Sequence, residues 1–203
     1  TYDDYGNVLT ATAVKDSVTV SVTTNTYNQI GWKLSESTTS EGNTTSTESV
    51  YDLNGTVVRT KNEKDEYTRY VYDAAGRLVQ KIGPKDYRAA QDGLNSTPVQ
   101  YGYSNGAVGE RYVYNVYGDI LRYTNAQGKV TRYVYDDDRN LVQKIGFEQY
   151  NPADDGLYNS TPADTYYDDS VGYRYSYNSY KQVIREIKPN GDTTRYIYDA
   201  NKN

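Results

Sequence analysis

Acidic runs are the first feature of this sequence whose residue types could support chemistry. Four runs lie among Asn and Gly residues, whose oxygen atoms together with carboxylates suit Ca²⁺. None has the Asp-x-[Asp/Asn]-x-[Asp/Asn]-Gly spacing of a calcium loop. We therefore expect solvated turn carboxylates and no metal site at Asp3–Asp4, Asp136–Asp138, Asp154–Asp155 and Asp168–Asp169.

Paired carboxylates could also form the acid and base of a glycosidase. Such a pair needs one carboxyl group whose pKa is raised by burial, whereas these groups lie in turn-like segments. The 203 residues include no His, Cys or Met, which excludes Ser-His-Asp and Cys-His hydrolase sites and thiolate metal sites. We expect no enzymatic activity, no cofactor, and no catalytic, cofactor-binding or metal-binding residues.

Tyrosines are the other residues that could contact a ligand. The chain has 26 Tyr, one Trp and one Phe, and aromatic faces beside Asn, Asp and Arg suit sugar rings. Packing between strands is the simpler explanation, and it predicts a core built from phenol rings rather than leucines. Four Asn-x-Ser/Thr sequences would matter only in a glycosylating host; they begin at Asn43, Asn54, Asn95 and Asn159.

Many of the tyrosines belong to an internal repeat. The last tyrosines of the Tyr-Asp and Tyr-Asn motifs are spaced by 21, 42, 21, 42 and 21 residues. A longer period is superposed, because TRYVYDAAGRLVQKIG from Thr68 matches TRYVYDDDRNLVQKIG from Thr131. Each 63-residue unit holds one plain repeat and one repeat with an insertion, around Gly83–Pro98 and Gly146–Pro162. DGLNSTP from Asp92 matches DGLYNSTP from Asp155 within these insertions.

The repeat-defining residues share a structural role in our interpretation. They are Tyr51, Asp52, Arg69, Tyr70, Tyr72, Asp73, Gly76, Arg111, Tyr112, Tyr114, Gly118, Arg132, Tyr133, Tyr135, Asp136, Arg174, Tyr175, Tyr177, Arg195, Tyr196, Tyr198 and Asp199.

One repeat, Thr68–Ile82, predicts a β-hairpin. Its first half alternates, with the tyrosines on one face and the arginine on the other. Asp73–Gly76 is typical of a type I turn, and a second strand follows. Stacked hairpins would align the Tyr-x-Tyr pairs as a ladder. We expect each arginine to bond the Asp or Asn after the pair, or a carboxylate of a neighbouring strand.

Some repeats depart from the turn pattern. Arg139, Lys181 and Lys202 replace the turn glycine, and Asn140 could take the left-handed conformation in place of its neighbour. Arg88–Gln91 in the first insertion could form one helical turn, although its counterpart contains Pro152.

The whole pattern predicts an all-β, mostly antiparallel fold, in which stacked hairpin repeats form a continuous twisted or spiralling sheet. Residues 1–50 hold degenerate repeats, and residues 51–203 hold the regular ones. Ser17–Thr23 alternates strictly and predicts a half-buried strand. Glu36–Ser49 is a polar stretch that predicts a long loop or a polar hairpin.

The motifs RYVYDAAGRL and RYIYDANKN, each preceded by a turn and a Thr-Arg, resemble the tyrosine-aspartate (YD) repeat, also called the Rhs repeat. The resemblance covers Tyr51–Asn203 well and Thr1–Val50 loosely. The family includes bacterial Rhs toxins, encapsulating subunits of toxin complexes, wall-associated bacterial proteins and teneurins. It implies a β-strip that spirals into a hollow shell, which in the toxins encloses a cytotoxic domain. The Asp-Pro-x-Gly-Leu self-cleavage element of the Rhs core does not occur in this sequence.

Composition and resemblance together lead to one functional prediction. A net charge of −5 argues against nucleic-acid binding, and no apolar run is long enough to enter a membrane. We expect a non-enzymatic segment of a YD-repeat shell or scaffold, from a large secreted or cell-surface bacterial protein. Its partners would be the remaining repeats of that chain or neighbouring subunits, with an enclosed toxin domain or surface glycans as further candidates. The alternative is an extracellular adhesin or self-assembling fibre of stacked repeats that contacts glycans.

Overall fold

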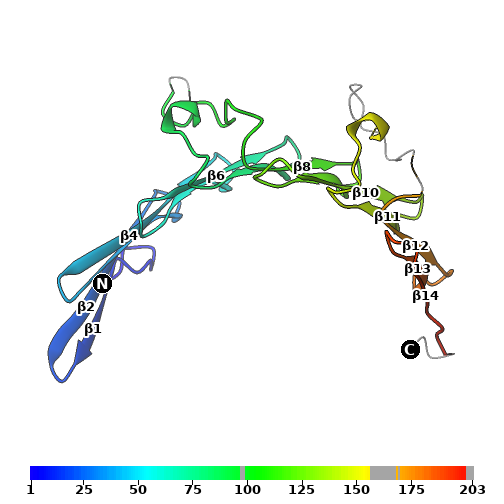
Figure 1. Ribbon diagram of the computed structural model, residues 1–203. Coiled ribbons are helices and arrows are strands. Elements are labelled where there is room, and N and C mark those ends of the chain that lie inside the picture. The colour runs from blue at the N-terminus through cyan, green and yellow to red at the C-terminus, as the bar shows by residue number, and fades with distance from the viewer. Residues whose placement is uncertain (97–98, 156–167, 169, 200–203) are drawn as a thin grey trace. The chain divides into compact units, whose positions relative to one another are not determined.

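The computed structural model describes residues 1–96, 99–155, 168 and 170–199 (Figure 1). The chain divides into two compact units, Thr1–Gly109 and Glu110–Asn203. The boundary that repeat regularity predicts at residue 50 lies inside the first unit. No helix among the described residues is long and apolar enough to cross a membrane.

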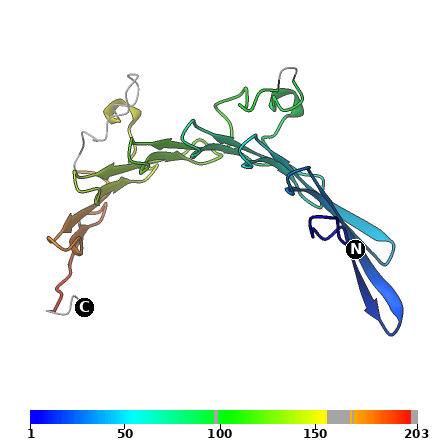
Figure 2. The same cartoon turned by 180° about the vertical axis from the view of Figure 1, so that it is seen from behind.

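The first unit is a single antiparallel sheet whose strands follow chain order. Its insertion stands off one face of the sheet and carries one short 3-10 helix, η1 (Figures 1 and 2). The elements are β1 (Thr10–Lys15), β2 (Val18–Tyr27), β3 (Lys33–Ser40), β4 (Asn43–Tyr51), β5 (Val57–Lys61), β6 (Tyr67–Tyr72), β7 (Leu78–Ile82) and η1 (Ala89–Gln91).

The second unit has the same plan, again with antiparallel neighbours in chain order. The predicted all-β fold of stacked hairpins is therefore confirmed. The elements are β8 (Glu110–Tyr114), β9 (Ile120–Thr124), β10 (Val130–Tyr135), β11 (Leu141–Ile145), η2 (Pro152–Asp154), β12 (Tyr173–Tyr177), β13 (Val183–Ile187) and β14 (Thr193–Arg195).

The hairpin turns form as the sequence predicts. The Asp73 carboxylate accepts the backbone N–H groups of Ala75 and Arg77, both at 2.9 Å, and Gly76 has a φ of +76°. An Asp or Asn at the equivalent position accepts the same two N–H groups in several other hairpins, as at Asp52 and Asn115. One carboxylate or amide thus closes each of these turns.

The prediction that Asn140 takes the left-handed conformation is wrong. Arg139 itself has a φ of +64°, and its guanidinium donates to both oxygens of Asp119 at 2.9 and 2.7 Å. Asn140 is held by the Asp136 carboxylate, which accepts its backbone and side-chain N–H groups at 2.7 and 2.9 Å. Lys181 likewise has a φ of +61°. Lys202 lies outside the described residues.

In several hairpins the last tyrosine of the Tyr-Asp or Tyr-Asn motif bonds to the backbone of a neighbouring strand. A bulge lies next to this tyrosine; in β8, for example, the bulge falls between Val113 and Tyr114, and Tyr114 pairs with Ile120 of β9. The Tyr135 hydroxyl of the next hairpin donates to the carbonyl of Ile120 at 3.2 Å. The same contact joins Tyr51 to Lys33, Tyr72 to Val57, Tyr177 to Leu141 and Tyr198 to Val183. Hydroxyl-to-carbonyl bonds are therefore the recurring contact of the predicted tyrosine ladder.

Replacing Tyr135 with phenylalanine should lower the free energy of unfolding by about 0.5–1.5 kcal/mol, the usual contribution of one hydrogen bond. The ring remains, and the variant loses only the bond to Ile120. Tyr117→Phe is the matched control, because Tyr117 is 67% exposed and surface changes usually stay within about 0.5 kcal/mol. Chemical denaturation measures both variants. Equal losses would mean that the hydroxyl-to-carbonyl bond contributes nothing specific.

The prediction of a phenol core is wrong. The buried hydrophobic side chains are mainly aliphatic, and most tyrosines are half-buried. A single-layer sheet leaves its tyrosines partly solvated, whereas burial is complete mainly where an insertion covers the sheet. Tyr150 and Val171, for example, pack on Val134 and Ile145. The buried hydrophobic residues are Val58, Ile82, Tyr103, Leu121, Val134 and Ile145.

The structure decides between the alternatives that the sequence leaves open for the less regular segments. Glu36–Ser49 forms the polar hairpin of β3 and β4. The alternating Ser17–Thr23 segment lies mostly in β2, but it is not half-buried throughout, since Val18 and Val20 are 64% and 39% exposed. Both insertions contain a helical turn. Pro152 begins η2, a position where its missing N–H donor costs nothing.

Candidate functional site

The insertion of the first unit is fixed to the sheet by a buried ionic cluster, which we call cluster 1: Arg59, Arg69, Tyr87 and Asp92. Arg59 and Arg69 are paired across β5 and β6. Arg69 and Asp92 are both 0% exposed, and Arg69 Nε lies 2.8 Å from Asp92 Oδ1. The other carboxylate oxygen accepts from Arg59 and, at 2.7 Å, from the Tyr87 hydroxyl.

The remaining donors of Arg69 also have partners. Its guanidinium bonds the carbonyl of Val58 at 2.8 Å and the carbonyls of Tyr70 and Tyr101. A buried charge is tolerated when it is paired and its other hydrogen-bonding groups are satisfied. The arginine therefore joins two strands and two parts of the insertion around one carboxylate.

The cluster also shifts the pKa values of Tyr87 and Arg59. Burial, together with the bond to Asp92, raises the pKa of Tyr87 to about 12. Burial opposes the charge of Arg59, but the bonds to Asp92 and Tyr87 outweigh it and raise the pKa of that guanidinium. Tyr87 is therefore a neutral hydrogen-bond donor at physiological pH, and Arg59 is charged.

The second unit holds an equivalent cluster 2, formed by Arg122, Arg132, Tyr150 and Asp155, which occupy the corresponding positions of the next 63-residue unit. Arg132 Nε lies 2.6 Å from Asp155 Oδ1, and Arg122 lies 3.2 Å from Oδ2. The Tyr150 hydroxyl donates to the same Oδ2, and its pKa is raised to about 12 by burial and by this bond. The same four residue types thus form the same contacts twice.

A buried glutamine fixes the return end of each insertion. Gln80 donates to the carbonyls of Asn105 and Val108 at 3.0 and 2.8 Å. Gln143 donates in the same way to Asp168 and Val171, at 2.9 and 2.8 Å. Each insertion is therefore attached to the sheet at two places, by a carboxylate near its middle and by a glutamine near its end.

A glycine follows each glutamine contact and lies against the sheet backbone. Gly109 has a φ of +70°, and a Cβ there would lie 2.3 Å from the Lys81 carbonyl oxygen. Gly172 has a φ of +73°, with a distance of 2.4 Å to the Lys144 carbonyl oxygen. Only glycine fits both the conformation and the space.

The prediction for the arginine partners is wrong at the two buried positions. Arg69 and Arg132 pair with insertion carboxylates, because Asp73 and Asp136 already accept the N–H groups of their own turns. The other repeat arginines are not fully buried: Arg111 and Arg174 are half-buried, and Arg195 is exposed.

Sequence reasoning missed Arg59 and Tyr87 of cluster 1, and the separate attachment at Gln80, as site residues. All three lie outside the Tyr-x-Tyr-Asp motif. The 63-residue recurrence could have identified them, because each has an identical residue at the corresponding position of the next unit.

The clusters are not arranged for acid–base chemistry. Both oxygens of Asp92, and both of Asp155, are bonded to arginine or tyrosine. Within the described part of the chain, no three acidic side chains converge as a metal site would require. Of the calcium candidates, Asp3 and Asp136 close turns and Asp155 belongs to cluster 2. Asp169 lies outside the described residues.

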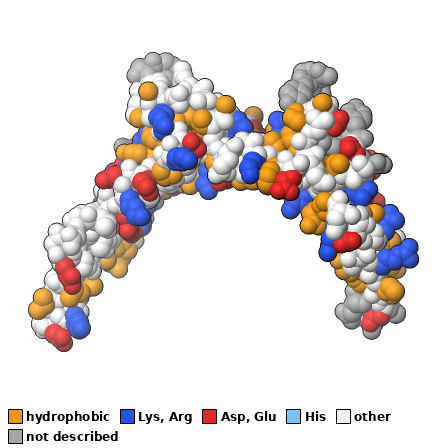
Figure 3. Space-filling view, in the orientation of Figure 1, with side chains coloured by type: hydrophobic (Ala, Val, Ile, Leu, Met, Phe, Trp, Pro, Cys, Tyr) orange, Lys and Arg blue, Asp and Glu red, His pale blue; other side chains and the backbone are white. Residues whose placement is uncertain are grey.

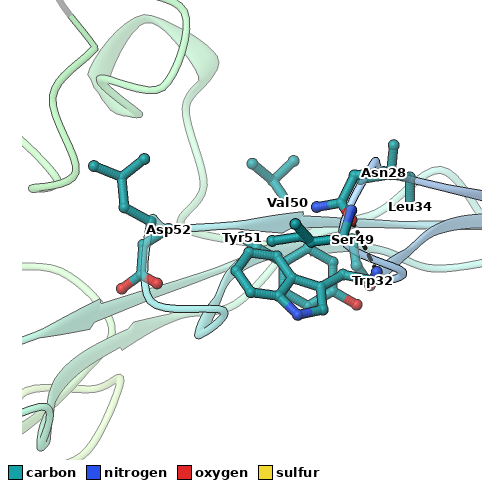
Figure 4. Close-up of a pocket in the computed structure, with 9 residues that line it drawn as sticks. Asn28, Trp32, Leu34, Ser49, Val50, Tyr51 and Asp52 are labelled. Atoms are coloured by element: carbon teal, nitrogen blue, oxygen red, sulfur yellow. Dashed lines mark hydrogen bonds between the residues drawn. The ribbon is translucent and has the colours of Figure 1, made fainter.

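The surface has mixed charge, and one of its aromatic contacts joins Trp32 to Tyr51. Acidic and basic side chains are interspersed on the face drawn in Figure 3. Trp32 and Tyr51 lie 5.3 Å apart between ring centroids, beside Leu34 and Val50 (Figure 4). Of the Asn-x-Ser/Thr sequences, Asn43, Asn54 and Asn95 are exposed, and Asn159 lies outside the described residues.

Comparison with known proteins identifies one family model, RHS Repeat, which matches residues 51–86. The "tRNA3(Ser)-specific nuclease WapA" of Bacillus spizizenii is 29% identical over 212 residues, covering 98% of this chain and 7% of that protein. The "tRNA nuclease WapA" of Bacillus subtilis is 32% identical over 168 residues, covering 67% of this chain and 7% of that protein.

Among solved structures, the "Crystal Structure of TcdB2-TccC3-Cdc42" matches with a TM-score of 0.59 and 17% identity. The match covers 91% of this chain and 9% of that one. The likeness therefore concerns the fold, and the chain spans less than a tenth of each of these proteins.

Proposed function

We propose that this chain is a wall segment of a YD-repeat shell, since residues 51–86 match the RHS Repeat model and the fold is similar to part of the TcdB2-TccC3-Cdc42 structure. The observation that carries this proposal is the fold match, which extends over 91% of the chain. The mechanism is encapsulation. A continuous antiparallel sheet separates the interior of the shell from its surroundings, and the attached insertions thicken the sheet at intervals.

The wall itself is non-enzymatic in this proposal. The buried carboxylates that could have acted as acids or bases are fully engaged with arginine and tyrosine. Any reaction belongs to another domain of a longer secreted or cell-surface protein. Both WapA relatives are named as tRNA nucleases, which supports a nuclease-type toxin as the enclosed domain.

The test uses the full-length protein that contains this chain. Electron microscopy is expected to show hollow particles, and limited proteolysis is expected to leave the enclosed domain intact. Asp92→Ala combined with Asp155→Ala should open the wall and make that domain sensitive to protease. Rods or fibres, with no protected domain, would contradict the proposal and favour the adhesin or fibre alternative.

A further inference from the structure

A stacked pair of tyrosines joins the first insertion to the sheet. Tyr67 at the start of β6 and Tyr87 in the insertion have ring centroids 5.1 Å apart and ring planes inclined by 24°. This separation is typical of offset-stacked rings. Both residues are half-buried, so the pair is packed and still reachable from solvent.

The Tyr87 hydroxyl of this pair already has a hydrogen-bond acceptor. Tyr87 donates to Asp92 Oδ2 at 2.7 Å. A phenol loses an electron more readily when its proton can move along a hydrogen bond to a base. Asp92 is also bonded to Arg59 and Arg69 and takes no proton from the neutral phenol. Once an oxidant removes an electron from Tyr87, however, the phenol becomes strongly acidic, and its proton can pass to Asp92 Oδ2 to leave a neutral phenoxyl radical in contact with a second phenol.

We propose that Tyr67 and Tyr87 form an oxidative cross-linking site, at which a haem peroxidase with hydrogen peroxide joins the two rings as dityrosine. Each phenol loses one electron and its hydroxyl proton. The two radicals form a carbon–carbon bond between ring positions ortho to oxygen, and the hydrogens at those carbons move to the oxygens. The protein loses two hydrogen atoms in total, and one hydrogen peroxide is reduced to two waters.

A second pair in the other unit also combines close rings with a carboxylate acceptor, although its ring planes are inclined by 39°. Tyr112 and Tyr123 are cross-strand partners with ring centroids 5.2 Å apart. The Tyr112 hydroxyl donates to the Glu110 carboxylate at 2.9 Å. Two closely packed pairs with a carboxylate acceptor therefore occur in different local structures, one between an insertion and a strand and one between strands.

The composition of the chain favours this chemistry. Cys and Met normally consume oxidising equivalents, and the sequence contains neither. Secreted proteins commonly use disulfides to fasten loops, which this chain cannot do. A Tyr67–Tyr87 bond would fasten the insertion to the sheet in the same way, by closing a loop that runs from the start of β6 through β7 into the insertion.

The second unit provides a matched control. Tyr150 and Asp155 correspond to Tyr87 and Asp92 in the 63-residue repeat, but Val130 stands in the place of Tyr67. The second unit therefore lacks a counterpart of Tyr67 at position 130. Val130→Tyr would supply this ring beside Tyr150, whose hydroxyl already donates to Asp155.

The experiment treats the 203-residue chain with a haem peroxidase and limiting hydrogen peroxide, then maps peptides by mass spectrometry. We expect an intramolecular peptide pair joining Tyr67 to Tyr87, lighter by two hydrogen atoms. Tyr67→Phe keeps the ring and the fold but should abolish this product and leave the Tyr112–Tyr123 product. Val130→Tyr should add a link to Tyr150.

The control is Tyr117→Phe, which removes an exposed hydroxyl and should leave the Tyr67–Tyr87 product unchanged. Circular dichroism before oxidation verifies that each variant is folded. Cross-links confined to exposed tyrosines of separate molecules, with the same yield in Tyr67→Phe, would overturn the proposal.

Discussion

Replacing Asp92 with alanine is expected to lower the free energy of unfolding by about 3–5 kcal/mol, the usual cost of removing one partner of a buried ion pair. Arg69 is 0% exposed and would keep its charge without a counter-ion. Arg59 and Tyr87 would lose the same acceptor. Chemical denaturation of the chain measures the loss.

A surface ion pair is the matched control for Asp92→Ala. Lys33 and Glu36 lie 2.8 Å apart, but both side chains are 45% exposed, so Glu36→Ala should cost less than about 1 kcal/mol. Asp155→Ala repeats the test in cluster 2. Because each cluster is built around its own carboxylate, Asp92 or Asp155, the two costs should add to within about 0.5 kcal/mol. Similar small losses for Asp92→Ala and Glu36→Ala would show that burial of the pair contributes little.

Sequence patterns predict the local structure of this chain well, because each hairpin is specified within about one repeat. Asp73 and Gly76 specify their turn by side-chain bonding and by a positive φ. Alternation specifies the strands on either side. The all-β class and the antiparallel order then follow from the short connections.

The core and the arginine partners could not be predicted from one repeat, because they depend on contacts across an insertion. Arg69 and Asp92 are 23 residues apart, which exceeds the 21-residue period on which the motif was defined. A carboxylate in an Asp-Gly-Leu sequence is also indistinguishable from a turn carboxylate by local pattern. The recurrence of Asp92 as Asp155, in matching insertions of the 63-residue repeat, was the available sign that this carboxylate has a structural role.

The glycine that ends each insertion has the second large expected effect. Gly172→Ala should lower the free energy of unfolding by about 1–2 kcal/mol for the left-handed conformation and by about 1–3 kcal/mol more for overpacking. The new Cβ would lie 2.4 Å from the Lys144 carbonyl oxygen, which belongs to the backbone of β11 and cannot rotate away. Denaturation measures the total, and hydrogen exchange should show lost protection in β12, the strand that begins next to this glycine.

Gly118→Ala separates the two contributions within the same unit. Gly118 has a φ of +91°, but among the described residues no atom beyond its two chain neighbours lies within 4 Å of the position that a Cβ would take. Gly118→Ala should therefore lower the free energy of unfolding by only about 1–2 kcal/mol. If Gly172→Ala costs no more than Gly118→Ala, the close approach of the insertion to β11 is not a tight contact. A larger loss at Gly172 means that the return of the insertion is fixed by backbone contact as well as by Gln143. The sheet would then depend on glycine at each place where an insertion rejoins it.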